Sequence, residues 1–381
     1  MNNNTKNGTV TMRVTCAIFF LLFTFLYLFN YQADILAATQ HVLSHGVTHY
    51  DRTIGAILLT AILWVVQLVV YGICGLSRQS HSLTYLPSML LLGILTSGDA
   101  HLGEESYLSN WLWGFPLLMV AYGALVWVCR QLESLEQPVS DTGIFSRLSW
   151  HNMLTMVVMA FITCWIGNSD QLFHYRMRME GHIVQRDYAA AMNVGRKEAT
   201  TDSSLTMLRV WALSENHQLG DRLFTYPLTG GSEAMLPNGR SVRLIMADEH
   251  RLYAHLGCVI KEKMSPRDYL EALHHIHRAT PAAHDWLLCA YLLDRRLDLF
   301  ARHLGTYYPI DDHLPKHYKE ALILYNHSTS HPCLTYHNNV KEADFEDFQD
   351  LEDKYTDKRE RYTALRDKYG DTYWFYYQTG R

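Results

Sequence analysis

Residues Ile54–Ile73 read IGAILLTAILWVVQLVVYGI and contain no charged side chain. A helix needs about 20 apolar residues to cross the hydrocarbon core of a bilayer, and this stretch has that length and composition. Further apolar stretches lie at Val14–Tyr31, Leu83–Thr96, Trp111–Cys129 and Trp150–Ile166. The sequence therefore predicts a multi-spanning membrane protein. Leu83–Thr96 is the weakest predicted span, because it is short and contains Pro87.

Charge divides the chain into two parts. Residues 1–166 contain 6 Lys/Arg and 8 Asp/Glu, whereas residues 167–381 contain 27 and 30. We therefore predict a transmembrane domain over 1–166, with spans near 14–31, 54–73, 83–96, 111–129 and 150–166, and a soluble domain over 167–381. The soluble part has no basic block, which argues against nucleic acid as a partner. The lipid bilayer is the first expected partner.

The distribution of Lys and Arg near the predicted spans sets the expected orientation. With the N-terminus in the cytoplasm, five basic residues lie inside and four outside, and the acidic loop 97–110 lies outside. An odd number of spans then places the C-terminal domain in the periplasm, in a multi-pass protein of the bacterial inner membrane. Losing Leu83–Thr96 from the count reverses this placement.

The soluble part shows apolar spacing nearer 3.6 than 2 residues, which indicates helices. The predicted helices are Glu180–Lys197, Ser203–His217, Ala247–Lys263, Pro266–Ala279, Ala282–Leu304, Pro315–Asn326 and Val340–Tyr369. Near 227–246 the pattern changes, and Asn238-Gly239 indicates a loop or a small hairpin between Ala234–Leu236 and Val242–Met246. The predicted fold is all-α throughout.

Three segments of the soluble part echo one another. Each carries an aromatic residue followed at i+3 by a small residue and at i+7 by a third position, in the sets Tyr188/Ala191/Gly195, Tyr269/Ala272/Ile276 and Tyr318/Ala321/Tyr325. A small residue between larger ones lets a neighbouring helix approach closely. The pattern resembles the second helix of a tetratricopeptide repeat, but the segments are not separated by multiples of about 34 residues. We predict an irregular, tetratricopeptide-like helical array.

Four segments resemble a known family. They are QHVLSHGVTHY at 40–50, LTYLPS at 83–88, LPKHYKEA at 314–321 and GDTYWF at 370–375. On these segments the chain is similar to an uncharacterised family of Gram-negative bacterial integral membrane proteins, classed as a domain of unknown function. The resemblance implies a membrane protein of the cell envelope and brings no catalytic residues with it.

The sharpest candidates for chemistry are His41, His45 and His49. A spacing of four places three side chains on one face of a continuous helix, and His-x3-His can bind Zn²⁺. Their possible partners are the acidic residues and histidine of two loops, Asp51, Asp99, His101, Glu104 and Glu105. Gly46 interrupts the helix, so interfacial histidines bound to water or headgroups are the preferred interpretation, and no metal site is assigned. A second cluster, of His274, His275, His277 and His284, is a weaker candidate.

Motifs of the common enzyme classes are missing from the sequence. It contains no G-x-S-x-G, no G-x-x-x-x-G-K-[ST], no G-x-G-x-x-G and no H-E-x-x-H. We therefore expect a non-enzymatic protein without a cofactor, whose helical domain binds another envelope protein or a peptide. A membrane enzyme acting on lipid-linked or envelope saccharide is the first alternative, and a transporter component is the second.

Overall fold

The computed structural model describes residues 3–99, 105–132, 146–196, 198, 200–260 and 262–379, with the side chains of 3–8 and 105–110 left aside. Within these ranges every regular element is a helix, which confirms the all-α prediction. The chain divides into two compact units, Met1–Met177 and Arg178–Arg381. The division falls inside a helix, α7 (Gln171–Val184), rather than at residue 166.

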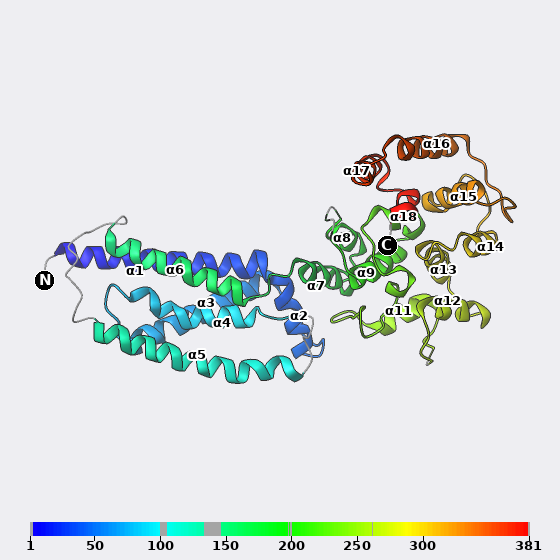
Figure 1. Ribbon diagram of the computed structural model, residues 1–381. Coiled ribbons are helices and arrows are strands. Elements are labelled where there is room, and N and C mark those ends of the chain that lie inside the picture. Colours follow the sequence, from blue (N-terminus) through cyan, green and yellow to red (C-terminus); the bar gives the residue numbers. More distant parts are fainter. Residues whose placement is uncertain are drawn as a thin grey trace. The chain divides into compact units, whose positions relative to one another are not determined.

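Unit 1 is a bundle of long apolar helices, which Figure 1 shows in blue to green. Its elements are α1 (Asn3–Leu26), the π-helical turn η1 (Tyr27–Tyr31), α2 (Ala33–Leu43), α3 (Arg52–Cys74), the 3-10 helix η2 (His81–Tyr85), α4 (Leu86–Leu95), α5 (Glu105–Leu132) and α6 (Arg147–Ile166). Four stretches are long and apolar enough to cross a membrane: Thr9–Tyr31, Arg52–Cys74, Trp111–Leu132 and Arg147–Ile166. The fifth predicted span corresponds to the shorter segment His81–Leu95.

Contacts between helix ends show that successive segments of unit 1 run in opposite directions. At one end, here end A, Arg52 at the start of α3 donates to the carbonyl of Phe29, and the amide of Asn168 donates to Thr96 O at 2.8 Å. At the other end, end B, Arg130 of α5 donates to Cys74 O, at 2.8 Å from Nε. The chain therefore enters unit 1 at end B and leaves it at end A.

The short segment His81–Leu95 runs alongside α6 from end B to end A. At end B the side chain of Asn152 accepts from Ser82 N at 2.8 Å and donates to Arg78 O at 3.0 Å. At end A, Asn168 lies beside Thr96. Five 3-10 residues and ten α-helical residues rise about 25 Å together. Met89 and Leu92 of α4 are 1% and 0% exposed. This helix therefore packs against other helices of unit 1, unlike a helix at the periphery of a bundle, which would face lipid.

Unit 2 is an array of shorter helices. They are α8 (Tyr188–Asn193), α9 (Ser203–Glu215), α10 (Leu219–Arg222), α11 (Glu249–Leu256), α12 (Pro266–His275), α13 (Pro281–Leu293), α14 (Leu297–Tyr307), α15 (Lys316–Ser328), α16 (Asn339–Lys354), α17 (Lys358–Tyr369) and α18 (Tyr373–Thr379), with the 3-10 turns η4 (Leu223–Thr225) and η5 (Gly231–Ala234). In Figure 1 consecutive helices lie next to one another from α12 to α18. The core runs through α9 and α13, where Trp211 and Trp286 are fully buried.

Several helices end on an unusual residue. Among the described residues, five other than glycine have left-handed φ values of 51–61°, and all are basic: His45, Arg186, His217, His277 and Arg295. Each stands two residues past its helix, and the next amide bonds back into the last turn, as Arg296 N does to Tyr291 O at 2.8 Å. This is the Schellman arrangement, for which glycine is the usual residue. A basic side chain is favourable there because it lies at the negative end of the helix dipole.

These endings correct two predicted helices. Ala282–Leu304 is two helices, α13 and α14, separated at Arg295. Glu180–Lys197 likewise ends as α7 at Val184, and α8 begins after the left-handed Arg186. Val340–Tyr369 is also two helices, because Asp357 accepts from Arg359 N at 2.8 Å and Glu360 N at 3.1 Å and so starts α17.

The region near 227–246 is a loop without strands, one of the two forms predicted for it. The buried carboxylate of Glu180, on α7, accepts from three successive amides, at 2.9 Å from Ile245, 2.7 Å from Met246 and 3.2 Å from Ala247. Asn238 accepts from Arg240 N and Val242 N and closes the turn. Side chains, together with the backbone bond from Asn238 N to Val242 O at 3.1 Å, therefore hold this loop in place of a hairpin ladder.

The echoing segments differ in burial. On α15 the set is fully internal, since Tyr318, Ala321 and Tyr325 are 0%, 0% and 3% exposed. On α12, Ala272 is half-buried, and Ile276 lies past the helix end with 53% exposure. Helical pairing is thus observed, while the resemblance to tetratricopeptide repeats stays a prediction.

Candidate functional site

The three candidate histidines lie at the end of α2 in unit 1. The helix stops at Leu43, His45 adopts φ 51°, and Gly46 N donates to His41 O at 2.8 Å. His49 follows in an extended segment. The prediction that all three share one helical face is therefore wrong, because the chain reverses at His45.

The described residues around His41, His45 and His49 do not form a set of metal ligands. Across 3–99, 105–132 and the other described ranges, no three His, Cys, Asp or Glu side chains are placed to hold an ion. Of the loop partners considered, His101 and Glu104 lie outside the described residues, as does the side chain of Glu105. Partial burial, and then the charge of His49, lower the pKa of His41.

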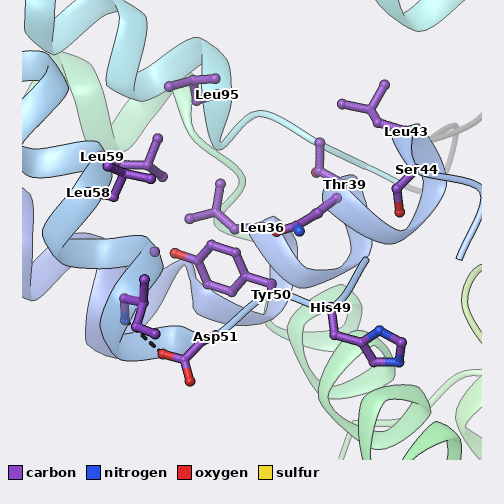
Figure 2. Close-up of a pocket in the computed structure, with 13 residues that line it drawn as sticks. Leu36, Thr39, Leu43, Ser44, His49, Tyr50, Asp51, Leu58, Leu59 and Leu95 are labelled. Carbon is purple, nitrogen blue, oxygen red and sulfur yellow. Dashed lines mark hydrogen bonds between the residues drawn. The ribbon is translucent and has the colours of Figure 1, made fainter. Parts of the chain in front are cut away.

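A cavity of about 640 Å³ lies beside this turn, between α2, the start of α3 and the end of α4 (Figure 2). Its apolar lining consists of Leu36, Leu43, Ile54, Gly55, Leu58, Leu59 and Leu95. Its polar lining consists of Thr39, Gln40, Ser44, His49, Tyr50 and Asp51. Such a volume and mixture of surfaces is typical of small-molecule sites.

Tyr50 occupies the centre of this cavity's lining. In Figure 2 its ring lies near Leu36, and the hydroxyl points away from His49. The ring rests against Gly55, where a Cβ atom would come within 2.3 Å of it, so any other residue at position 55 would displace the ring. The hydroxyl is buried without a hydrogen-bond partner, and burial raises the pKa of Tyr50 to about 12. Tyr50 is therefore a neutral donor at physiological pH.

The second histidine cluster forms a ring stack rather than a ligand set. His284 lies 4.2 Å from the Tyr307 ring and 4.9 Å from His274, between centroids. His274 Nδ1 is 2.7 Å from Leu270 O, so its ring is held in place. His275 and His277 are exposed and outside the stack. Burial, and then His274, lower the pKa of His284.

Unit 2 carries a second cavity, of about 610 Å³, which we call the aromatic groove. One wall is formed by residues 224–228, and the other by α17 and α18. The side chains used below are Phe224, Tyr226, Tyr362, Phe375, Tyr376, Arg366 and Glu198. Phe224 and Tyr376 lie 4.8 Å apart, and Tyr362 lies 5.4 Å from Phe375.

Hydrogen bonds fix the rings on the floor of the aromatic groove. Tyr226 donates to Met192 O at 3.0 Å, and Tyr376 donates to Leu293 O at 2.9 Å. Tyr362, by contrast, is 46% exposed. Among the described residues of the lining, Arg366 supplies the positive charge, and its carboxylate neighbour Asp367 is 3.8 Å away at an exposed position. The described part of the groove thus offers pre-positioned aromatic surface and a positive charge.

Sequence reasoning missed the groove because its walls are more than a hundred residues apart in the chain. In the aromatic run at 373–377, Tyr373 and Trp374 fill the interior of unit 2 at 0% and 2% exposure, so they line no surface. Phe224 and Tyr226 carried no separate signal. Only the packing of α18 against residues 224–226 joins the two groups.

Two of the four segments that resemble a known family meet in unit 2. Lys316 and Asp371 form an ion pair at 2.8 Å. Glu320 accepts from Tyr373 N at 2.8 Å, and its carboxylate lies 2.9 Å from His317 Nδ1. Trp374 Nε1 donates to Glu320 O at 2.8 Å. The segments 314–321 and 370–375 therefore form one buried junction between α15 and α18.

The fold and these sites define an α-helical protein whose first unit contains helices long and apolar enough to span a membrane, and whose second unit is also helical. Residues 258–380 match the model of a family of unknown function, DUF6057. The match confirms the predicted resemblance to an uncharacterised family, and it contains both segments of the buried junction. No curated protein and no solved structure matches the chain.

Proposed function

We propose that this protein is a membrane-anchored binding protein of the bacterial envelope, whose second unit holds an extended polypeptide segment in the aromatic groove. The observation that carries the proposal is the groove itself. The floor rings of Tyr226 and Tyr376 are held by hydrogen bonds before binding, so little of their conformational entropy is lost on association. Tyrosine, phenylalanine and arginine are the residue types enriched at protein interfaces.

The charge of the groove favours a particular kind of segment. Arg366 projects from α17 at the groove, while the buried floor is apolar. A bound segment should therefore place aromatic or aliphatic side chains against Phe224 and Phe375 and an acidic group near Arg366. Glu198, also in the lining, disfavours a second acidic group at its own side.

Anchoring fits the four membrane-length helices of unit 1. Arg78, Arg130 and Arg147 belong to end B, and Arg13 packs over the ring of Tyr71 near the same end, at 5.2 Å. Arg52 belongs to end A. Counting Lys6 with end B, and Arg176, Arg178 and Arg186 after α6 with end A, leaves an excess of one basic residue at end B. This small excess supports an inner-membrane protein with end B in the cytoplasm and the second unit in the periplasm.

Selection from a random peptide library on purified protein tests the proposal. We expect enriched peptides to combine an aromatic and an acidic residue. Arg366→Glu should shift the selection toward Lys- or Arg-containing peptides. Arg359→Glu makes the same charge change on the same helix, at an exposed position outside the groove, and should leave the selection unchanged. Identical selections from all three proteins would reject the groove as the binding site.

A further inference from the structure

The cavity beside Tyr50 in unit 1 has a lining divided by polarity. Leu36, Leu58 and Leu95 come from three different helices and form part of its apolar wall. Thr39, Ser44 and Asp51 belong to its polar side. Ile54 and Leu58 are 66% and 57% exposed, so the apolar wall is continuous with helix surface that would face lipid. An occupant with an apolar chain can therefore enter from the bilayer.

Most polar groups around this cavity already have partners. Asp51 accepts from Thr53 N at 2.9 Å and Ile54 N at 2.7 Å, which starts α3. Thr39 donates to Ile35 O at 2.9 Å, and Gln40 donates to Thr48 at 2.9 Å. The Tyr50 hydroxyl differs, because it is buried in the lining and has no partner. A buried hydroxyl without a partner is costly, so a bound oxygen acceptor would relieve that cost.

The charges of the lining select among lipid headgroups. Its thirteen residues include no Lys and no Arg, and its one carboxylate is Asp51. Among the described residues the nearby cation is Arg52, whose charge reaches Tyr50 but whose guanidinium already donates to Phe29 O and Asn30 O. A phosphate headgroup would therefore find no cation in the lining itself and would be repelled by the carboxylate of Asp51. An uncharged headgroup needs no cation and is not repelled by the carboxylate of Asp51.

We propose that this cavity binds a neutral acyl lipid, with its chain along Leu36, Leu58 and Leu95 and an uncharged ester or hydroxyl oxygen accepting from Tyr50. The cavity volume of about 640 Å³ lies inside the range of small-ligand sites, roughly 300–1,000 Å³. This inference concerns unit 1 alone and does not rest on the function proposed for unit 2.

Photolabelling of the full-length protein in phospholipid nanodiscs tests it. The probes are diacylglycerol and phosphatidylglycerol with the same photoreactive acyl chain, each present as a minor component. We expect diacylglycerol to label residues of α2, α3 and Leu95 several times more strongly than phosphatidylglycerol. Equal labelling by the two probes would mean ordinary lipid contact and would overturn the proposal.

Two variants and a control test whether the labelled lipid occupies the cavity. Leu58→Trp fills it and should abolish the preference for diacylglycerol. Leu68→Trp is the matched control, on the same helix at 48% exposure and outside the lining, and should retain the preference. Tyr50→Phe keeps the ring against Gly55 and should reduce diacylglycerol labelling about fivefold, as expected for one hydrogen bond. Unchanged labelling of both Leu58→Trp and Tyr50→Phe would also overturn the proposal.

Discussion

The carboxylate of Glu320 accepts a hydrogen bond from the backbone amide of Tyr373 at 2.8 Å, and neither side chain is exposed. This contact joins α15 to the first residue of α18, and it places the aromatic end of the chain inside unit 2. Because α18 also supplies Phe375 and Tyr376 to the aromatic groove, a structural contact here supports a candidate binding surface.

Removing this acceptor should loosen α18. Glu320→Ala leaves the Tyr373 amide and His317 without a partner in a buried place, which should cost about 3 kcal/mol. Hydrogen exchange of residues 372–379 in the full-length protein should rise strongly. Glu346→Ala, on the exposed face of α16, is the control and should not alter it. Protection equal to wild type in Glu320→Ala would show that the junction does not hold α18.

Enlarging the small residue should affect the echoing segments of α15 and α12 differently. Ala321 is fully buried on α15, so Ala321→Leu should lower the free energy of unfolding by roughly 1–3 kcal/mol. Ala272 is half-buried, so Ala272→Leu should cost much less. Chemical denaturation followed through the tryptophans of unit 2 measures both. Lys319→Leu, at the half-buried position next to Tyr318 and off the stripe, is the control. An equal loss in all three variants would contradict the close contact at Ala321.

The sequence predicted membrane helices and a helical second part well, because both rest on local patterns that no packing detail changes. It failed where one residue changed the direction of the chain. Arg295 and His277 take a conformation usually reserved for glycine, so the endings of α13 and α12 carried no glycine signal. At His45 a glycine signal is present at the next position, Gly46, yet the spacing of four still predicted a single face for His41, His45 and His49, which the structure does not have.

The sites were less accessible to sequence reasoning than the fold. Tyr50 lies within the histidine-containing segment 40–50. Its place in the cavity depends on its contact with Gly55 of the next helix and on a buried hydroxyl without a hydrogen-bond partner. The aromatic groove joins Phe224 to Tyr376 across most of unit 2. Such relationships depend on tertiary packing, which apolar spacing along one segment does not encode.

Acid should destabilise unit 2 through the histidine stack. The pKa of His284 in the folded protein lies below its ordinary 6.5, so the unfolded chain binds more protons just below that pH. The free energy of unfolding should therefore fall as the pH drops through about 6.5 toward the folded pKa. Denaturation midpoints measured from pH 7.5 to 5 should show a shallower decline in His284→Gln. His331→Gln, at an exposed position, should follow wild type, and a decline unchanged in His284→Gln would exclude the stack as its source.

The orientation of the chain in the membrane depends on the segment His81–Leu95. If this segment crosses the bilayer with the four longer helices, the chain crosses five times, and its second unit lies on the opposite side from its N-terminus. Reporter enzymes active only outside the cytoplasm, fused after residues 105, 140 and 200, should then be active, inactive and active. If His81–Leu95 instead turns back at end B, all three fusions should change state, to inactive, active and inactive. Activity at 140 with inactivity at 200 would therefore reject the five-span arrangement and the periplasmic location of the aromatic groove.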